Sequence, residues 1–141
     1  MLLTAFANRN EEDGDLLAAL ASWLRVAKRA DEALDAARDA AATEPDSPTV
    51  LRELAFALRE KGRLTEALAT YRHWRAVAPG DDIALWDEGQ ALEEAGRLDE
   101  AIAAYRTLYR QFAHVRQSAA GLLGRALAKA GRYAEAIPLL R

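Results

Sequence analysis

The sequence predicts an all-α protein built from antiparallel helix–turn–helix repeats. The first observation is a stretch that begins at position 62, Gly-Arg-Leu-Thr-Glu-Ala-Leu, and returns in related form at positions 96 and 131 and in a more divergent form at 28. The spacings are 34, 34 and 35 residues, and self-similarity at such a period marks an array of small units that cannot bury their apolar faces alone. The second observation is a composition rich in alanine and leucine, which favours helix.

The composition also narrows the class of protein. Hydrophobic residues make up 51% of the 141-residue chain, enough for one compact domain or a short solenoid. The net charge of −3 argues against nucleic acid as the main partner, because phosphate binding needs a clustered positive surface. The chain has no cysteine, no apolar run long enough to cross a membrane and no signal-peptide pattern at its start. A cytoplasmic protein without membrane insertion is expected.

The charge changes sign from one repeat to the next. Residues 1–13 carry −2, and the segments 14–47, 48–81, 82–115 and 116–141 carry −3, +2, −4 and +4. Neighbouring repeats of opposite sign are expected to attract weakly, and salt is expected to screen that attraction.

Residues 1–13 are expected to form a capping segment before the repeats. Leu2, Leu3 and Phe6 can share one side of a short helix. Trp23 stands where the later repeats have alanine, so a contact between Trp23 and this segment is predicted.

The first helix pair is expected at about 14–27 and 31–43. Leucines recur in the first of these helices at the spacing of one helical face, and Asp31 is a plausible N-cap of the second. Lys28 replaces the glycine that the other repeats have at the turn between the two helices. A looser or differently closed turn is therefore predicted there.

The later pairs have clearer boundaries. Ser47 followed by Pro48 predicts a capped helix start with proline at the first helical position, and Thr65 is the expected cap of the helix after it. That second helix places Trp74 where a small residue is usual, and this tryptophan is expected in the core. The third pair is predicted at 82–95 and 99–112, and the fourth begins near 117 with its second helix near 134. The short linkers require consecutive helices to pack antiparallel.

In this register the sequence resembles the tetratricopeptide repeat family. The family pattern has a large residue, Leu-Gly and an aromatic on the first helix, then alanine, an aromatic and proline on the second. The repeat 48–81 fills those places with Leu51, Leu54-Ala55, Leu58, Ala67, Tyr71 and Pro79. Small residues on the first helices, such as Gly89 and Gly124, let paired helices approach closely. The resemblance covers about 14–141 and implies repeats at 14–47, 48–81 and 82–116 with a partial repeat at 117–141, in one continuous domain 1–141 that belongs to a longer protein.

The resemblance implies a right-handed superhelical solenoid whose concave groove is lined by the first helix of each pair. Phe56 and Trp86 would be adjacent in that groove, and arginines would flank them. Such residues dominate binding hot spots, so a non-enzymatic scaffold that binds an unidentified protein or peptide is the primary hypothesis. The predicted binding residues are Phe56, Trp86, Arg52, Arg59, Gln90 and Arg125. The alternative for the two aromatics is that they pack between neighbouring helices.

Two other functions stay open. The chain could associate with itself or dock a following domain through apolar residues near its end, Ile137, Leu139 and Leu140, because an incomplete repeat exposes apolar surface. It could also be the regulatory arm of a larger enzyme, such as a transferase.

No catalytic, metal-binding or cofactor-binding pattern stands out in the sequence. His73 and His114 fall far apart in the repeat, so a shared metal site is not expected. Glu88 stands where the pattern expects a core leucine, and a buried carboxylate needs a partner. Glu88 should therefore reach solvent or pair with an arginine; contact with a ligand is the alternative.

Overall fold

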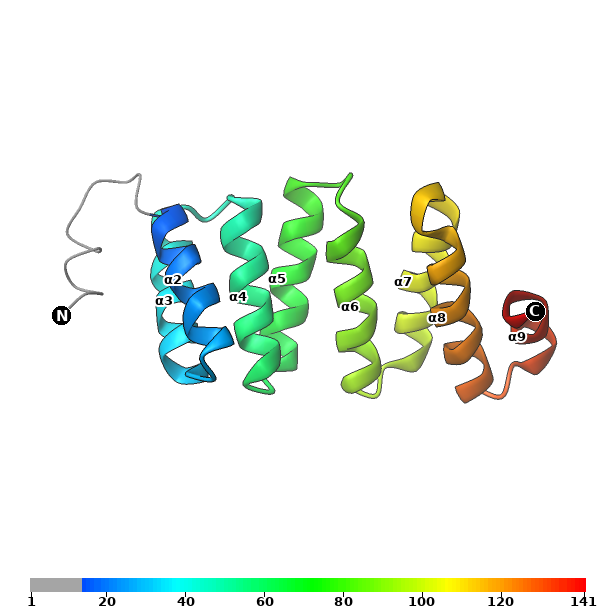
Figure 1. Ribbon diagram of the computed structural model, residues 1–141. Coiled ribbons are helices and arrows are strands. Elements are labelled where there is room, and N and C mark those ends of the chain that lie inside the picture. Colours follow the sequence, from blue (N-terminus) through cyan, green and yellow to red (C-terminus); the bar gives the residue numbers. More distant parts are fainter. Residues whose placement is uncertain (1–13) are drawn as a thin grey trace. The chain divides into compact units, whose positions relative to one another are not determined.

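The computed structural model describes residues 14–141 (Figure 1), and the predicted capping segment 1–13 lies outside them. The described residues form helices and no strand. The first two helix pairs are α2 (Gly14–Val26) with α3 (Ala30–Thr43), and α4 (Pro48–Glu60) with α5 (Leu64–Val77). They are followed by α6 (Asp82–Glu94), α7 (Leu98–Gln111), the 3-10 turn η2 (Ala113–Val115), α8 (Arg116–Lys129) and α9 (Tyr133–Leu140). The all-α helix–turn–helix prediction is confirmed.

The helices form two compact units, Met1–Pro79 and Gly80–Arg141. In the first unit, α2 packs on α3, α4 packs on α5, and α3 and α2 both contact α4. In the second unit, α6 packs on α7 and α8 on α9, and α7 contacts α8. Each unit therefore contains two helix pairs that pack against each other.

The turns within the pairs close in the same way in all four cases. Gly62, Gly96 and Gly131 have φ values of 73°, 74° and 77°, in the left-handed region that ends many helices. Lys28 also has a positive φ, 63°. Its turn closes with the same hydrogen bond, in which the next residue's N–H donates to the carbonyl five residues back, from Arg29 to the oxygen of Leu24 at 2.9 Å. The prediction of a looser first turn was therefore wrong, because Lys28 accepts the strained conformation.

Helix starts differ between the two kinds of helix. Ser47 caps α4 through its side chain, which accepts from the Val50 N–H at 3.5 Å, with Pro48 at the first helical position as predicted. The second helices of the pairs start earlier than expected, so Asp31 and Thr65 lie inside the first turn and do not cap it. Arginines occupy the N-cap positions there without a side-chain cap bond: Arg29, Arg63, Arg97 and Arg132.

The core of each unit is filled by aromatic and leucine side chains against small residues. Trp74 is 1% exposed and stacks on Tyr71, which confirms its predicted core position. A Cβ added to Gly89 would lie 2.4 Å from the ring of Tyr105, and one added to Gly124 would lie 2.7 Å from Leu140. Because these glycines have no Cβ, a large side chain of the paired helix can pack directly on the backbone of the first helix.

Candidate protein-interaction surface

One set of predicted binding residues lies on α4 in the first unit. Arg52, Phe56 and Arg59 follow one another at helical spacings of four and three residues, so they share one face of the helix. All three are half-buried. The Phe56 ring meets Trp74 edge-on, with 6.3 Å between ring centroids. The guanidinium carbon of Arg25 on α2 lies 5.4 Å from the Phe56 centroid, within the range of a cation–π contact.

Beside Phe56, a buried carboxylate organises the arginines. The Glu53 side chain is 6% exposed, and its oxygens lie 3.7 Å from Nε of Arg25 and 3.8 Å from Nε of Arg52. Arg25 also approaches Glu60, at 3.8 Å. A buried charge is tolerated when opposite charges face it, so Glu53 fixes Arg25 above the Phe56 ring. Sequence reasoning missed Glu53. The signal was its place among arginines, next to Arg52 and 28 residues after Arg25, the same separation as in the ion pair Arg38–Glu66.

The second set of predicted residues lies in the second unit. Trp86 and Gln90 are half-buried, four residues apart on α6, and Arg125 is exposed on α8. The nearby Glu93 of α6 accepts hydrogen bonds from Nζ of Lys129 at 2.8 Å and from the hydroxyl of Tyr105 at 2.5 Å. Burial raises the pKa of Glu93, but the hydrogen bonds from Lys129 and Tyr105 outweigh it, and the net pKa lies below 4.5. This carboxylate joins α6, α7 and α8 in one contact.

The structure thus brings Arg52, Phe56 and Arg59 together on one helix, and Trp86 and Gln90 on another. Phe56 belongs to the first unit and Trp86 to the second. Their adjacency in one groove stays a prediction.

Two family models identify the repeats. Both are described as tetratricopeptide repeat; one matches residues 73–115 and 86–141, and the other matches residues 24–91. Together they span 24–141. The chain belongs to the tetratricopeptide repeat family.

Solved structures share the tetratricopeptide fold. A crystal structure of MamA has a TM-score of 0.82 at 18% identity, over 92% of this chain and 74% of that one. MamA from Desulfovibrio magneticus RS-1, residues 41 to the end, has a TM-score of 0.78 at 19% identity, over 89% of this chain and 71% of that one. Identities this low show the fold alone. No curated protein matches the chain. Family membership supports a general role as a protein-interaction scaffold.

The two histidines of this tetratricopeptide chain are each paired within their own unit, whereas Glu88 is buried. Glu88 is 4% exposed, so it does not reach solvent, and the alternatives of pairing with an arginine or contacting a ligand stay predictions. His73 pairs with Asp46 at 2.8 Å, and His114 lies 3.4 Å from Asp82. Across residues 14–141, no group of three or more acidic, histidine or cysteine side chains could hold a metal ion. Nor is any helix in that range long and apolar enough to cross a membrane.

An open hollow of about 310 Å³ lies between α7, α8 and α9. Its lining is mostly apolar, with Leu123, Leu127 and Leu139 among its residues, and Arg106 and Arg110 stand beside them. Sequence reasoning did not find this hollow because three helices of the tetratricopeptide array contribute to it and no single motif marks it.

Proposed function

We propose that the chain is a non-enzymatic scaffold that binds a segment of another protein on the face formed by the first helices of its repeats. The observation that carries this proposal is the half-buried Phe56, whose ring is held edge-on by Trp74 and covered by the guanidinium of Arg25. An aromatic ring fixed in place loses little conformational freedom on binding, and aromatic and arginine side chains dominate interface hot spots.

The charges around Phe56 suggest the chemistry of the bound segment. Arg25 lies over the ring, and Arg52 and Arg59 follow on the same face of α4, while Glu53 and Glu60 balance part of the charge of Arg25 and Arg52. The side chain of Arg52 is 42% exposed, so it can still meet a carboxylate. A segment with an apolar anchor residue and an acidic neighbour fits this face best. Trp86, Gln90 and Arg125 are the second unit's proposed contribution to binding.

The test begins with affinity capture of a partner, followed by binding measurements on purified variants. The Phe56→Ala, Trp86→Ala double variant should bind at least tenfold more weakly, as expected for truncated hot spots. Arg52→Glu should also weaken binding. Arg110→Glu is the matched control, because Arg110 is exposed on α7, which is a second helix. Unchanged affinity in the double variant, with a normal helical circular dichroism spectrum, would rule out this surface. The cytoplasmic location stays a prediction.

A further inference from the structure

We propose that the second unit takes one large apolar side chain of the bound segment into open space at Gly121, beside Trp86 and one turn before Arg125. This inference rests on the proposed function and adds the chemistry that the second unit recognises. The bound segment carries an aromatic or leucine side chain next to a carboxylate, and the carboxylate lies over α8. The site needs no residue of the first unit.

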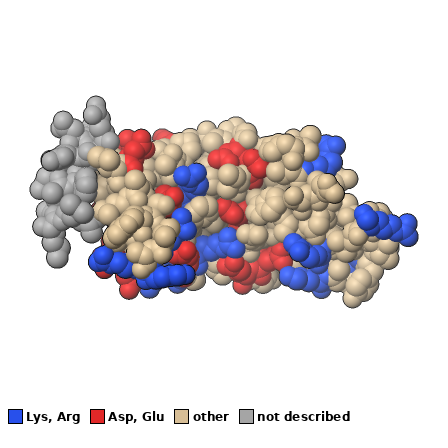
Figure 2. All heavy atoms as spheres, in the orientation of Figure 1, with Lys and Arg blue, Asp and Glu red and all other residues tan. Residues whose placement is uncertain are grey.

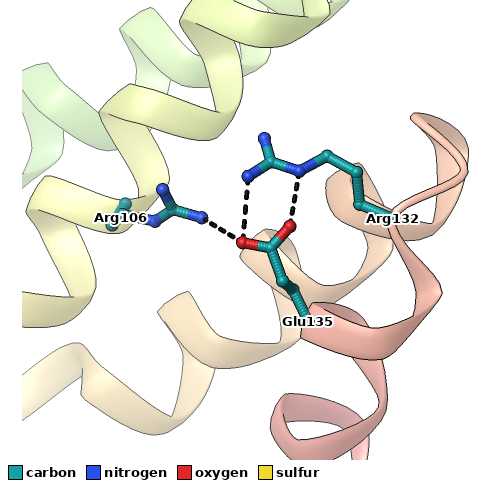
Figure 3. Close-up of polar contacts among 3 residues, drawn as sticks. All are labelled: Arg106, Arg132 and Glu135. Carbon is teal, nitrogen blue, oxygen red and sulfur yellow. Dashed lines mark hydrogen bonds and ion pairs between the residues drawn. The ribbon is translucent and has the colours of Figure 1, made fainter.

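The second helices show that neighbouring repeats pack in the same register in both units. In the second unit, Nη2 of Arg106 on α7 lies 3.4 Å from Glu135 on α9 (Figure 3), 29 residues later. In the first unit, Nη2 of Arg38 on α3 lies 3.1 Å from Glu66 on α5, 28 residues later. Equivalent residues of the two units therefore make the same contact between repeats.

The first helices follow this register as well. In the first unit, Arg25 of α2 lies 3.8 Å from Glu60 of α4, which is 35 residues later in the chain. In the second unit, Nζ of Lys129 on α8 lies 2.8 Å from Glu93 on α6, across a separation of 36 residues. Side chains about one repeat apart therefore meet across neighbouring first helices.

The same register puts Trp86 of α6 beside Gly121 of α8, because both precede the Glu93–Lys129 contact by about two helical turns. A Cβ added to Gly121 would meet no atom within 4 Å. The equivalent residues of the two preceding repeats are Trp86 and Arg52, which have large side chains. Because α7 and α9 pack on other sides of α8, a partner's side chain can approach Gly121 on the first-helix face.

Trp86 forms an apolar wall of this space. It is half-buried, and within residues 14–141 it makes no ring contact and its indole N–H has no hydrogen-bond acceptor. Phe56 differs, because Trp74 and Arg25 already contact its ring. Ile83, one turn before Trp86, is 47% exposed and extends the apolar surface. A large apolar side chain, and an aromatic one above all, can pack here.

Charge determines how the segment is oriented. Arg125 is exposed one turn after Gly121, and within residues 14–141 it forms no ion pair or hydrogen bond, whereas Lys129 is engaged by Glu93. Figure 2 shows acidic side chains over α6 and basic side chains over α8. Complementary charge therefore places an acidic residue of the segment over α8, where the guanidinium of Arg125 can bind its carboxylate through two hydrogen bonds.

Peptide titrations followed by nuclear magnetic resonance test this chemistry on the full chain. The probe is the acetylated peptide Gly-Ser-Phe-Glu-Ser-Gly at millimolar concentration, and it should shift the Gly121 amide signal and the Trp86 indole N–H signal. Replacing its phenylalanine with alanine, or its glutamate with lysine, should weaken binding about tenfold or more, as expected for hot-spot contacts.

Variants of the chain test the position. Gly121→Leu should abolish binding of the probe, because the leucine side chain occupies the open space, and its circular dichroism spectrum should remain helical. Ala103→Leu is the matched control, since it adds the same side chain at an exposed position of the second helix α7, and it should bind as the wild type does. Arg125→Glu should reverse the preference, so that the lysine peptide binds more tightly than the probe.

The outcomes separate this inference from the proposed function. If Gly121 and Trp86 show no shift with the probe, or if Gly121→Leu binds it normally, the inference is overturned. Equal binding of the glutamate and lysine peptides would overturn the assignment of the acidic residue. In each case the captured partner and the Phe56→Ala, Trp86→Ala double variant still decide whether the first-helix face binds a protein.

Discussion

At the scale of single residues, Glu93 shows how one carboxylate can couple three helices. It accepts from Lys129 on α8 and from Tyr105 on α7, and its pKa is lowered although burial opposes this. A group whose pKa is lower in the folded state stabilises the fold above its unfolded pKa and loses that contribution as pH falls. The pH range in which this happens lies below 4.5.

We predict that Glu93→Gln lowers the free energy of unfolding at pH 7 by about 1 kcal/mol, because the charge-assisted bond from Lys129 is lost. The difference from the wild type should shrink as pH falls below 4.5, since Glu93 of the wild type then becomes protonated. Urea unfolding at pH 7 and at pH 3 measures both effects. Glu94→Gln, at the exposed next residue, is the control and should change stability less. A difference that is the same at both pH values would contradict this account.

Two glycines provide a matched pair on first helices. A Cβ at Gly89 would collide with the ring of Tyr105, whereas one at Gly121 would meet no atom within 4 Å. We predict that Gly89→Ala destabilises the chain by roughly 1–3 kcal/mol through overpacking. Gly121→Ala should stabilise it by up to about 1 kcal/mol, because alanine is the better helix former. Thermal unfolding of both variants measures the difference, and equal effects would show that Tyr105 relaxes at no cost.

The sequence predicted where residues lie in the fold better than it predicted which residues contact them. The place of Trp74 in the core follows from the repeat register, because the face that a helical position points to depends only on spacing. The burial of Glu53 does not follow from spacing on one helix. It depends on Arg25 of another helix lying close enough to balance its charge, and that is a tertiary contact.

At the scale of elements, the turn within the first pair contradicts the rule that a missing glycine loosens a turn. Lys28 adopts the left-handed conformation at a free-energy cost, because the helices on both sides determine the backbone path. The packing of α2 on α3 therefore overrides the local preference of the residue. The starts of the second helices differ from the prediction for a local reason: the pairs Arg29–Glu32 and Arg63–Glu66 span the first turn, and the expected caps Asp31 and Thr65 lie inside it.

We predict that Lys28→Gly stabilises the chain by roughly 0.5–1 kcal/mol. Glycine removes the backbone strain of the left-handed conformation, and this gain is partly offset because glycine gives the unfolded chain more conformational freedom. Gly62→Ala is the converse change and should destabilise by a similar amount, because alanine would have to take φ near 73°. Urea unfolding of the two variants checks both signs. Loss of stability in Lys28→Gly would mean that the lysine side chain contributes a contact that exceeds the strain.

At the scale of the whole molecule, the repeat period predicted the number and order of the helices from residue 14 onward. It could do so because the turn within each helix pair repeats a similar short sequence, which can be recognised without knowledge of tertiary contacts. It did not predict the division into the units Met1–Pro79 and Gly80–Arg141. Pro45 ends the preceding repeat at the corresponding place, inside the first unit, so a proline at the end of a repeat does not by itself mark a boundary.

The division into two units predicts which helices a destabilising substitution affects. In repeat arrays, stability is a sum of the intrinsic terms of the repeats and contacts between nearest neighbours, and regions open independently according to local stability. Gly89→Ala should therefore raise amide hydrogen exchange in α6 to α9 by about tenfold or more, while α2 to α5 keep most of their protection. Lys28→Gly should slow exchange mainly in α2 and α3. Hydrogen-exchange mass spectrometry on the full chain resolves these regions. A uniform rise in exchange from α2 to α9 in Gly89→Ala would instead show that the two units open as one.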